Sequence, residues 1–170
     1  MEVFVKRENW DGGIWMKLPA LEEQAEQIQK ELAGYHPSRM IPFIGDVQVP
    51  VVGLAPLLIG EFVFQDSNLG QLNYLATKIG SWSEQERAVF ETVLQNEKPD
   101  SLLRIVEAMD HLDQYECHPE IKTLEQYGHY MFEREGRTLP AELTGYFDYE
   151  AYGRIHIKAS ERLTDEVLIT

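Results

Sequence analysis

Two periods of apolar residues follow each other along the first part of the chain, and together they predict a small sheet with one helix. Apolar positions at 3–5 and 14–18 are typical of two short strands, and the Asp-Gly-Gly sequence at 11–13 favours a turn between them. Residues 40–44 and 47–51 predict two further strands. Between the first pair of strands and the second lies the pattern of an amphipathic helix. Its apolar face holds Leu21, Ala25, Ile28 and Leu32.

The most apolar stretch of the chain runs from Val47 to Phe64. Two prolines and two glycines interrupt it, so it is too broken to span a membrane. Its apolar residues follow neither the helical nor the strand period. We expect a buried, irregular connection at 45–66, and an exposed contact patch is the alternative interpretation.

The middle of the chain predicts three amphipathic helices joined by short turns, which should pack as a compact bundle. The first begins near Asn68, and the second begins at Ser83, where Ser83 and Glu86 have the spacing of a capping box. Asp100 is a favourable N-cap for the third. The apolar positions of the three helices are Leu69, Leu72, Leu75, Ala76 and Ile79; Val89, Phe90, Val93 and Leu94; and Leu102, Leu103, Ile105, Val106, Met109 and Leu112.

The last third mixes short helices with short strands. Thr123 is a favourable N-cap, a helical turn is predicted at 139–143, and strands are predicted at 155–157 and 167–169. The inner face of the helix after the cap would hold Leu124, Tyr127 and Met131.

The 170 residues, 44% of them hydrophobic, are enough to form a buried core. The order of elements predicts an α+β fold with three small domains in series. They are an N-terminal α/β domain at 1–66, a helical middle domain at 67–116 and a C-terminal α/β domain at 117–170.

Charge restricts the partners. The formal net charge is −14, and the chain has no cluster of lysine or arginine, so direct binding of nucleic acid is not expected. A field of this sign repels DNA and attracts basic surfaces, including those that normally hold DNA. The alternative is that the acidity only keeps the protein soluble.

The acidic excess is largest in the helical middle, where residues 61–116 hold eleven acids and four bases. On the third predicted helix, acids recur every three residues and form a slanted stripe if the end stays helical. For any single carboxylate an ordinary solvated surface is the simpler interpretation, so the hypothesis concerns the array. The candidate partner-binding acids are Glu84, Glu91, Glu97, Glu107, Asp110, Asp113 and Glu116.

The sequence does not favour an enzyme. It contains none of the short motifs of zinc proteases, phosphate-binding loops or serine hydrolases, so neither a cofactor nor a metal is expected. Glu107 and His111 stand four residues apart and could hold a metal, although a solvated pair is the favoured interpretation. Cys117 is the single cysteine, which fits a reducing compartment. The chain opens without a signal-peptide pattern, and we expect a cytoplasmic protein.

Three segments resemble motifs of the ArdA-type antirestriction family. The longest follows the Leu-Pro pair at 139–140 and spans 146–154, similar to Tyr-(Ile/Phe)-Asp-(Tyr/Phe)-(Glu/Gln)-Ala-Tyr-Gly-Arg. Residues 68–76 resemble a helix opening that contains Leu-Asn, and residues 13–19 resemble a strand that ends in Pro after a Gly-x-Trp sequence. Their order and spacing cover most of the chain.

The resemblance implies an elongated protein of three small domains that pairs through its C-terminal domain into a homodimer. Surface carboxylates of family members imitate the phosphates of bent DNA and occupy the DNA-binding groove of type I restriction–modification enzymes, without catalysis. The aromatic residues expected in the C-terminal core or the dimer contact are Tyr146, Phe147, Tyr149 and Tyr152. Asp148 and Glu150 could bond nearby backbone or pair with Arg154, and Gly153 is expected to adopt a positive φ.

A second function fits the residues less well. The apolar segment at 47–64 could bind a protein partner, which would make the chain an accessory or regulatory factor of a mobile genetic element. Salt separates the two hypotheses, because groove mimicry should weaken steeply with ionic strength and an apolar interface should not.

Overall fold

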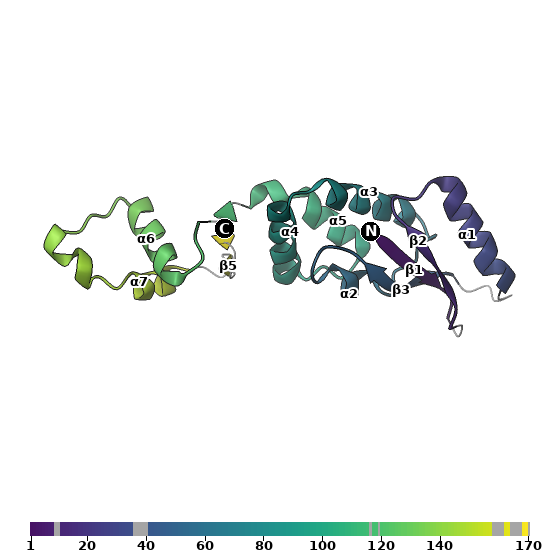
Figure 1. Cartoon of the computed structure of the whole chain (residues 1–170), viewed down its shortest axis with the longest axis horizontal. Helices are drawn as coiled ribbons and strands as arrows, with labels where there is room; N and C mark the ends of the chain where they lie inside the picture. The colour runs from purple at the N-terminus through teal and green to yellow at the C-terminus, as the bar shows by residue number, and fades with distance from the viewer. Residues whose placement is uncertain are drawn as a thin grey trace. The chain divides into compact units, whose positions relative to one another are not determined.

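The computed structural model divides the chain into two compact units, Met1–Leu112 and Asp113–Thr170 (Figure 1), and each is described by itself. The α+β class predicted from the sequence is confirmed. The structure describes residues 1–8, 11–35, 41–115, 117–118, 120–157, 162–163 and 168–169.

An antiparallel sheet of three strands forms one side of the first unit. Its strands are β1 (Glu2–Lys6), β2 (Gly13–Lys17) and β3 (Phe43–Gln48), in the spatial order β2-β1-β3. The apolar side chains of β1 alternate with polar ones, so Val3 and Val5 point to the same face and are fully buried. Met16 lies opposite Val3 and is buried on that face too.

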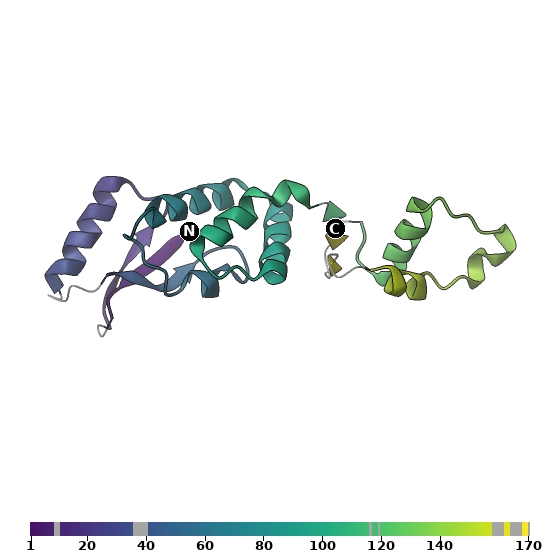
Figure 2. The ribbon, with the colours of Figure 1, turned by 180° about the vertical axis from the view of Figure 1, so that it is seen from behind.

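Five helices lie among the described residues of the first unit, and α5 packs against both α3 and α4. In Figures 1 and 2, α1 lies beside β2, on the side of the sheet away from α4. One continuous apolar core runs from Val3 in β1 to Met109 in α5, so it contains residues of both segments predicted as separate domains. The predicted boundary between residues 66 and 67 stays a prediction. The helices are α1 (Glu22–Tyr35), α2 (Leu54–Leu58), α3 (Asn68–Ser81), α4 (Glu84–Glu97) and α5 (Leu102–Asp110).

The apolar segment at 47–64 is more regular than expected. One strand, β3, replaces the two strands predicted at 40–44 and 47–51, and α2 follows it. The chain then returns along β3, where Phe62 pairs with Phe43. Since prolines and glycines divide the segment into pieces of a few residues, no single period extends far enough to be recognised in the sequence. Its buried side chains are Val47, Val51, Leu54, Leu58 and Val63.

The helix starts follow local hydrogen bonds. The capping box predicted at Ser83 and Glu86 is present. The third helix of the middle segment is capped one residue later than predicted, because the Ser101 hydroxyl accepts from the Arg104 N–H and Asp100 lies outside the helix.

The second unit is built around a helix pair, α6 (Leu124–Arg134) and α7 (Tyr149–His156). Thr123 caps α6 as predicted, in a capping box with Gln126. The short strands β4 (Cys117–His118), β5 (Arg162–Leu163) and β6 (Leu168–Ile169) form a second sheet in the order β4-β6-β5. Two 3-10 helices, η1 (Leu112–Gln114) and η2 (Ala141–Tyr146), complete the described elements.

Two expectations for this unit are wrong. Residues 155–157 do not form a strand, since Ile155 and His156 are the last residues of α7. Gly153 is not at a positive φ; it is helical and buried. A glycine is needed there because the backbone of α6 leaves no room for a side chain. The strand predicted at 167–169 is confirmed for Leu168 and Ile169.

Candidate functional site

Three of the candidate acids lie on α4, but they differ in their surroundings. Glu84 and Glu97 are exposed in the first and last turns of the helix. Glu91 is half-buried, and its Oε1 accepts a hydrogen bond of 2.6 Å from the Val52 N–H. Glu91 therefore joins α4 to the turn before α2 as well as adding negative charge.

The candidate acids of α5 are also held by partners. Asp110 Oδ1 accepts from the Tyr74 hydroxyl at 2.7 Å, which joins α5 to α3. Glu107 forms an ion pair with Arg104 at 2.8 Å. These contacts restrict where the two carboxylates can move, and Arg104 offsets part of the negative charge.

The predicted stripe of acids is not α-helical along its whole length. The helix α5 ends at Asp110, and Asp113 lies in the 3-10 helix η1. Glu116 lies outside the described residues. Among the candidate acids that the structure describes here, the helical spacing assumed for the sequence therefore holds for Glu107 and Asp110, and not for Asp113.

The helix α1 adds a set of acids that were not among the candidates from the sequence. Glu22, Glu23 and Glu26 are exposed, and Glu26 pairs with Lys30 at 3.2 Å. Their position off the apolar face of the helix was the available signal.

The aromatic run of the second unit forms much of the packing between α6 and α7. Phe147, Tyr149 and Tyr152 surround Phe132, with ring centroids 5.0, 5.7 and 5.6 Å from it. Tyr146 is 87% exposed and takes no part in this cluster. Three of the four candidate aromatics thus pack between α6 and α7 and are half-buried. The role of all four in the core or the dimer contact stays a prediction.

The carboxylate of Glu135, which lies next to this cluster, has a lowered pKa. The Tyr152 hydroxyl donates to Glu135 at 2.6 Å, and this bond lowers the pKa of Glu135. Arg137, at 2.6 Å from the same carboxylate, lowers that pKa further. Burial raises the pKa of Tyr152, and its hydrogen bond to Glu135 adds to the rise. At neutral pH Glu135 is therefore ionised and Tyr152 is protonated.

A comparison with protein families identifies the chain. The family model described as antirestriction protein (ArdA) matches residues 11–166. The chain belongs to the ArdA antirestriction family. The comparison with curated proteins gives no match. The three segments that resemble the family motifs all lie within the matched residues.

The C-terminal motif of this ArdA chain has a structural explanation. Asp148 is the N-cap of α7, and its Oδ1 accepts from the Ala151 N–H at 2.8 Å. Glu150 pairs with Arg154 one turn later. Both contacts were predicted, and they fix the start of the helix that carries Tyr149 and Tyr152.

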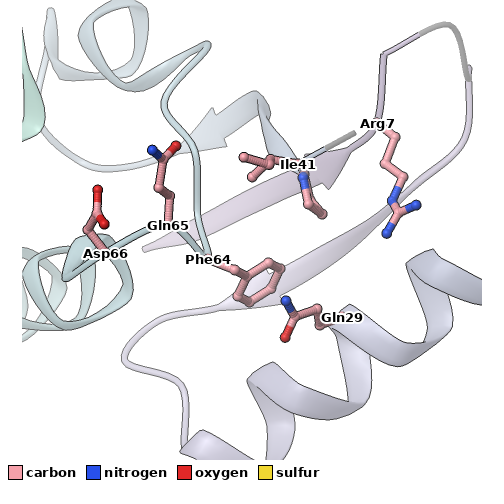
Figure 3. Close-up of a pocket in the computed structure, with 7 residues that line it drawn as sticks. Arg7, Gln29, Ile41, Phe64, Gln65 and Asp66 are labelled. Atoms are coloured by element: carbon pink, nitrogen blue, oxygen red, sulfur yellow. The ribbon is translucent and has the colours of Figure 1, made fainter. Parts of the chain in front are cut away.

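A cavity of about 390 Å³ lies at the side of the first unit (Figure 3). Arg7 enters it from the end of β1, although the residue is only 8% exposed. Figure 3 shows the Phe64 ring between Arg7 and Asp66, with Gln29 of α1 beside the ring. The cavity therefore offers one guanidinium and one carboxylate on either side of an aromatic ring.

Metal sites and membrane spans are two further features that bear on function. Within the described ranges, no three histidine, cysteine, aspartate or glutamate residues come close enough together to hold a metal ion. The Nδ1 atom of His111 contacts the carbonyl oxygen of Glu107 at 2.7 Å, so this candidate pair is joined through the backbone. No helix among the described residues is both long and apolar enough to cross a membrane.

Proposed function

We propose that this ArdA protein is a DNA mimic, which blocks type I restriction–modification enzymes by occupying their DNA-binding groove. Its carboxylates take the place of phosphates, and inhibition involves no catalytic step. The net charge of −14 supports attraction to a basic groove. DNA carries about one charge per 1.7 Å of its axis, so a mimic needs many carboxylates at controlled positions.

The observation that carries the proposal is the fixing of acids on the helices of the middle segment. Asp110 is held by Tyr74, and Glu91 is held by the backbone of Val52. Carboxylates in defined positions lose little conformational entropy on binding, so they bind better than mobile ones. Glu84, Glu97 and Glu107 then provide charge around these fixed points.

We further propose a homodimer formed by the second unit. Its exposed apolar side chains support this, because Tyr146 is 87%, Ile155 78% and Leu143 51% exposed. Tyr146 is the most exposed large apolar side chain among the described residues, and aromatic side chains are enriched in protein interfaces. Analytical ultracentrifugation of the protein and of Tyr146→Ser should show a dimer that weakens in the variant. A monomeric parent protein at micromolar concentration would refute the dimer.

The alternative function, docking of a partner on the 47–64 segment, has less support. Most of its large apolar side chains are in the core, and Val52, Ile59 and Phe62 are those that remain exposed.

Competition with DNA tests the proposed mimicry. The protein is titrated against DNA bound to a type I restriction–modification complex, at low and at raised salt. We expect DNA to be displaced, with an apparent affinity that falls steeply as salt rises. Displacement that does not change with salt would favour the apolar alternative. Failure of a folded sample to displace DNA at micromolar concentration would refute mimicry of this groove.

A further inference from the structure

The two edge strands of the first sheet, β3 and β2, differ in the hydrogen bonding of their outer sides. The outer edge of β3 is closed, because the Ile44 N–H donates to the Glu61 carbonyl at 2.9 Å and the Gly60 N–H donates to the Ile44 carbonyl at 2.8 Å. The strand β2 pairs with β1 on its inner side. On its outer side, no strand among the residues that the structure describes pairs with it. Edge strands left in this state are templates for another chain.

The hydrogen bonding of β2 shows which backbone groups face outward. The Leu18 N–H donates to the Met1 carbonyl at 2.9 Å, so Leu18 faces β1. In an antiparallel pair, hydrogen-bonding direction alternates from residue to residue. Ile14 and Met16 therefore face β1 as well, whereas the N–H and C=O groups of Trp15 and Lys17 point to the outer edge.

A groove runs along this same edge. It encloses about 270 Å³, and its strand side is formed by Trp15, Met16 and Lys17. Met16 points to the opposite face of the sheet from its two neighbours. The helix α1, which supplies the other lining residues, lies beside β2 in both views (Figures 1 and 2), so the groove lies where β2 faces α1. Trp15 is 42% exposed there.

The helix α1 forms the other side of the groove. Its lining residues are Gln24, Gln27, Ile28 and Glu31, which have the spacing of one helical stripe. The Gln27 amide donates to Glu31 at 3.0 Å and holds this carboxylate in place. An edge strand facing a helix in this way presents both backbone partners and side-chain pockets to an extended peptide.

The size and charge of the groove define its occupant. Its volume is below the range of about 300–1,000 Å³ that is common for sites of drug-sized ligands. An extended strand of a few residues is narrower than such a ligand and fits a narrower groove. Lys17 lies on the strand side of the groove and Glu31 on the helix side, so a basic side chain of the occupant is favoured next to Glu31, away from Lys17. We propose that β2 and α1 form a docking groove for an extended segment of a partner protein. The segment adds to the sheet as a fourth strand and directs a lysine or arginine toward Glu31.

This surface is separate from the acids proposed to imitate DNA, and its test does not depend on them. The probe is a phage-displayed library of random linear ten-residue peptides, selected on the whole protein. We expect the selected peptides to be rich in β-branched residues with a lysine or arginine. They should bind Trp15→Pro about tenfold more weakly than Trp15→Thr.

The two variants differ in one decisive respect. Proline removes the outward N–H of residue 15 without breaking a bond to β1, whereas threonine keeps that N–H. Slow amide exchange at Ile14 and Met16 will show that each variant is folded. Equal binding of the selected peptides to both variants, or failure to select any binder, would overturn the proposal. Displacement of DNA should be the same for both variants, which separates this test from the proposed function.

Charge-reversal variants and amide hydrogen exchange test the proposed groove independently of the residue 15 variants. Glu31→Lys should weaken binding of the selected basic peptides about tenfold, while the matched reversal Glu22→Lys, outside the groove, should leave it unchanged. Bound peptide should slow amide exchange at Trp15 and Lys17. Slow exchange of these two amides in the free protein would show that the edge is already covered, and would overturn the proposal.

Discussion

Gly128 of α6 and Gly153 of α7 bring the backbones of these two helices into direct contact. A Cβ atom on Gly128 would overlap with the carbonyl oxygen of Tyr149, and one on Gly153 would overlap with that of Leu124. The obstructing atoms belong to helix backbones, which cannot rotate away as a side chain can. The contact places Tyr149 and Tyr152 over α6, where they meet Phe132.

Alanine at either glycine should therefore separate the helices. We expect Gly153→Ala to lower the free energy of unfolding of the second unit by about 3 kcal/mol, the upper range for overpacking. Hydrogen exchange of the α6 amides measures this loss for that unit specifically.

A matched substitution separates packing from helix propensity. Gly70 is an exposed glycine of α3, and a Cβ atom at this position would meet no atom from another part of the described chain within 4 Å. Gly70→Ala should stabilise the protein by about 0.5–1 kcal/mol, because alanine restricts the unfolded chain more than glycine does. Similar effects of the two alanine substitutions would contradict the backbone contact.

The bond between Tyr152 and Glu135 predicts a dependence on pH. Since the folded protein has a lowered Glu135 pKa, the bond stabilises the fold above the ordinary pKa of glutamate, about 4.3. That stabilisation is lost as the pH falls through the lowered value. Tyr152→Phe should raise the Glu135 pKa toward the ordinary range, as followed by NMR titration of its carboxyl carbon. An unchanged titration in this variant would show that Arg137 and His156, and not the Tyr152 hydroxyl, cause the shift.

The parts of the fold that were predicted correctly depend on local interactions. Ser83 and Thr123 cap their helices through hydrogen bonds to residues three positions ahead, so a short stretch of sequence contains all the required groups. Asp100 and Ser101 are both favourable caps, and the sequence does not show which one the chain uses.

The parts that were missed depend on residues far apart in the chain. The apolar alternation at 155–157 resembles a strand, but Ile155 and His156 form the end of α7, the helix whose backbone packs against Gly128 of α6. The candidate site also depends on contacts between residues far apart in the chain. The acids on α4 and α5 were identified by residue type, whereas their partners Val52 and Tyr74 are distant in sequence. Composition indicates the charge of a surface, but packing decides which carboxylates are fixed.

Glu91 should behave differently from the other candidate acids. Because it accepts the Val52 N–H, Glu91→Ala should cost about 1 kcal/mol of stability, with the exposed side of the carboxylate reducing the effect. Glu91→Gln keeps an acceptor and should cost less. Chemical denaturation of both variants measures the difference. If glutamine is as destabilising as alanine, then charge and not the hydrogen bond is the contribution of Glu91.

The final prediction separates the arrangement of acids from the total charge. Single reversals at Glu84, Glu97 or Glu107 should change DNA displacement little, because one exposed charge contributes about 0–1 kcal/mol. The triple reversal to lysine should weaken displacement by roughly tenfold or more. A single reversal that abolishes inhibition in a folded protein would contradict an array and indicate one essential contact.

The matched control is the triple reversal of Glu22, Glu23 and Glu26 on α1, which changes the net charge by the same amount. If the acids of α4 and α5 form the mimicking surface, the α1 variant should retain most of its displacement at raised salt, where long-range attraction is screened. At low salt both variants should lose affinity, since both weaken the overall field. Equal losses at every salt concentration would mean that net charge alone attracts the enzyme, and that the positions of Glu84, Glu97 and Glu107 on α4 and α5 contribute nothing further to inhibition.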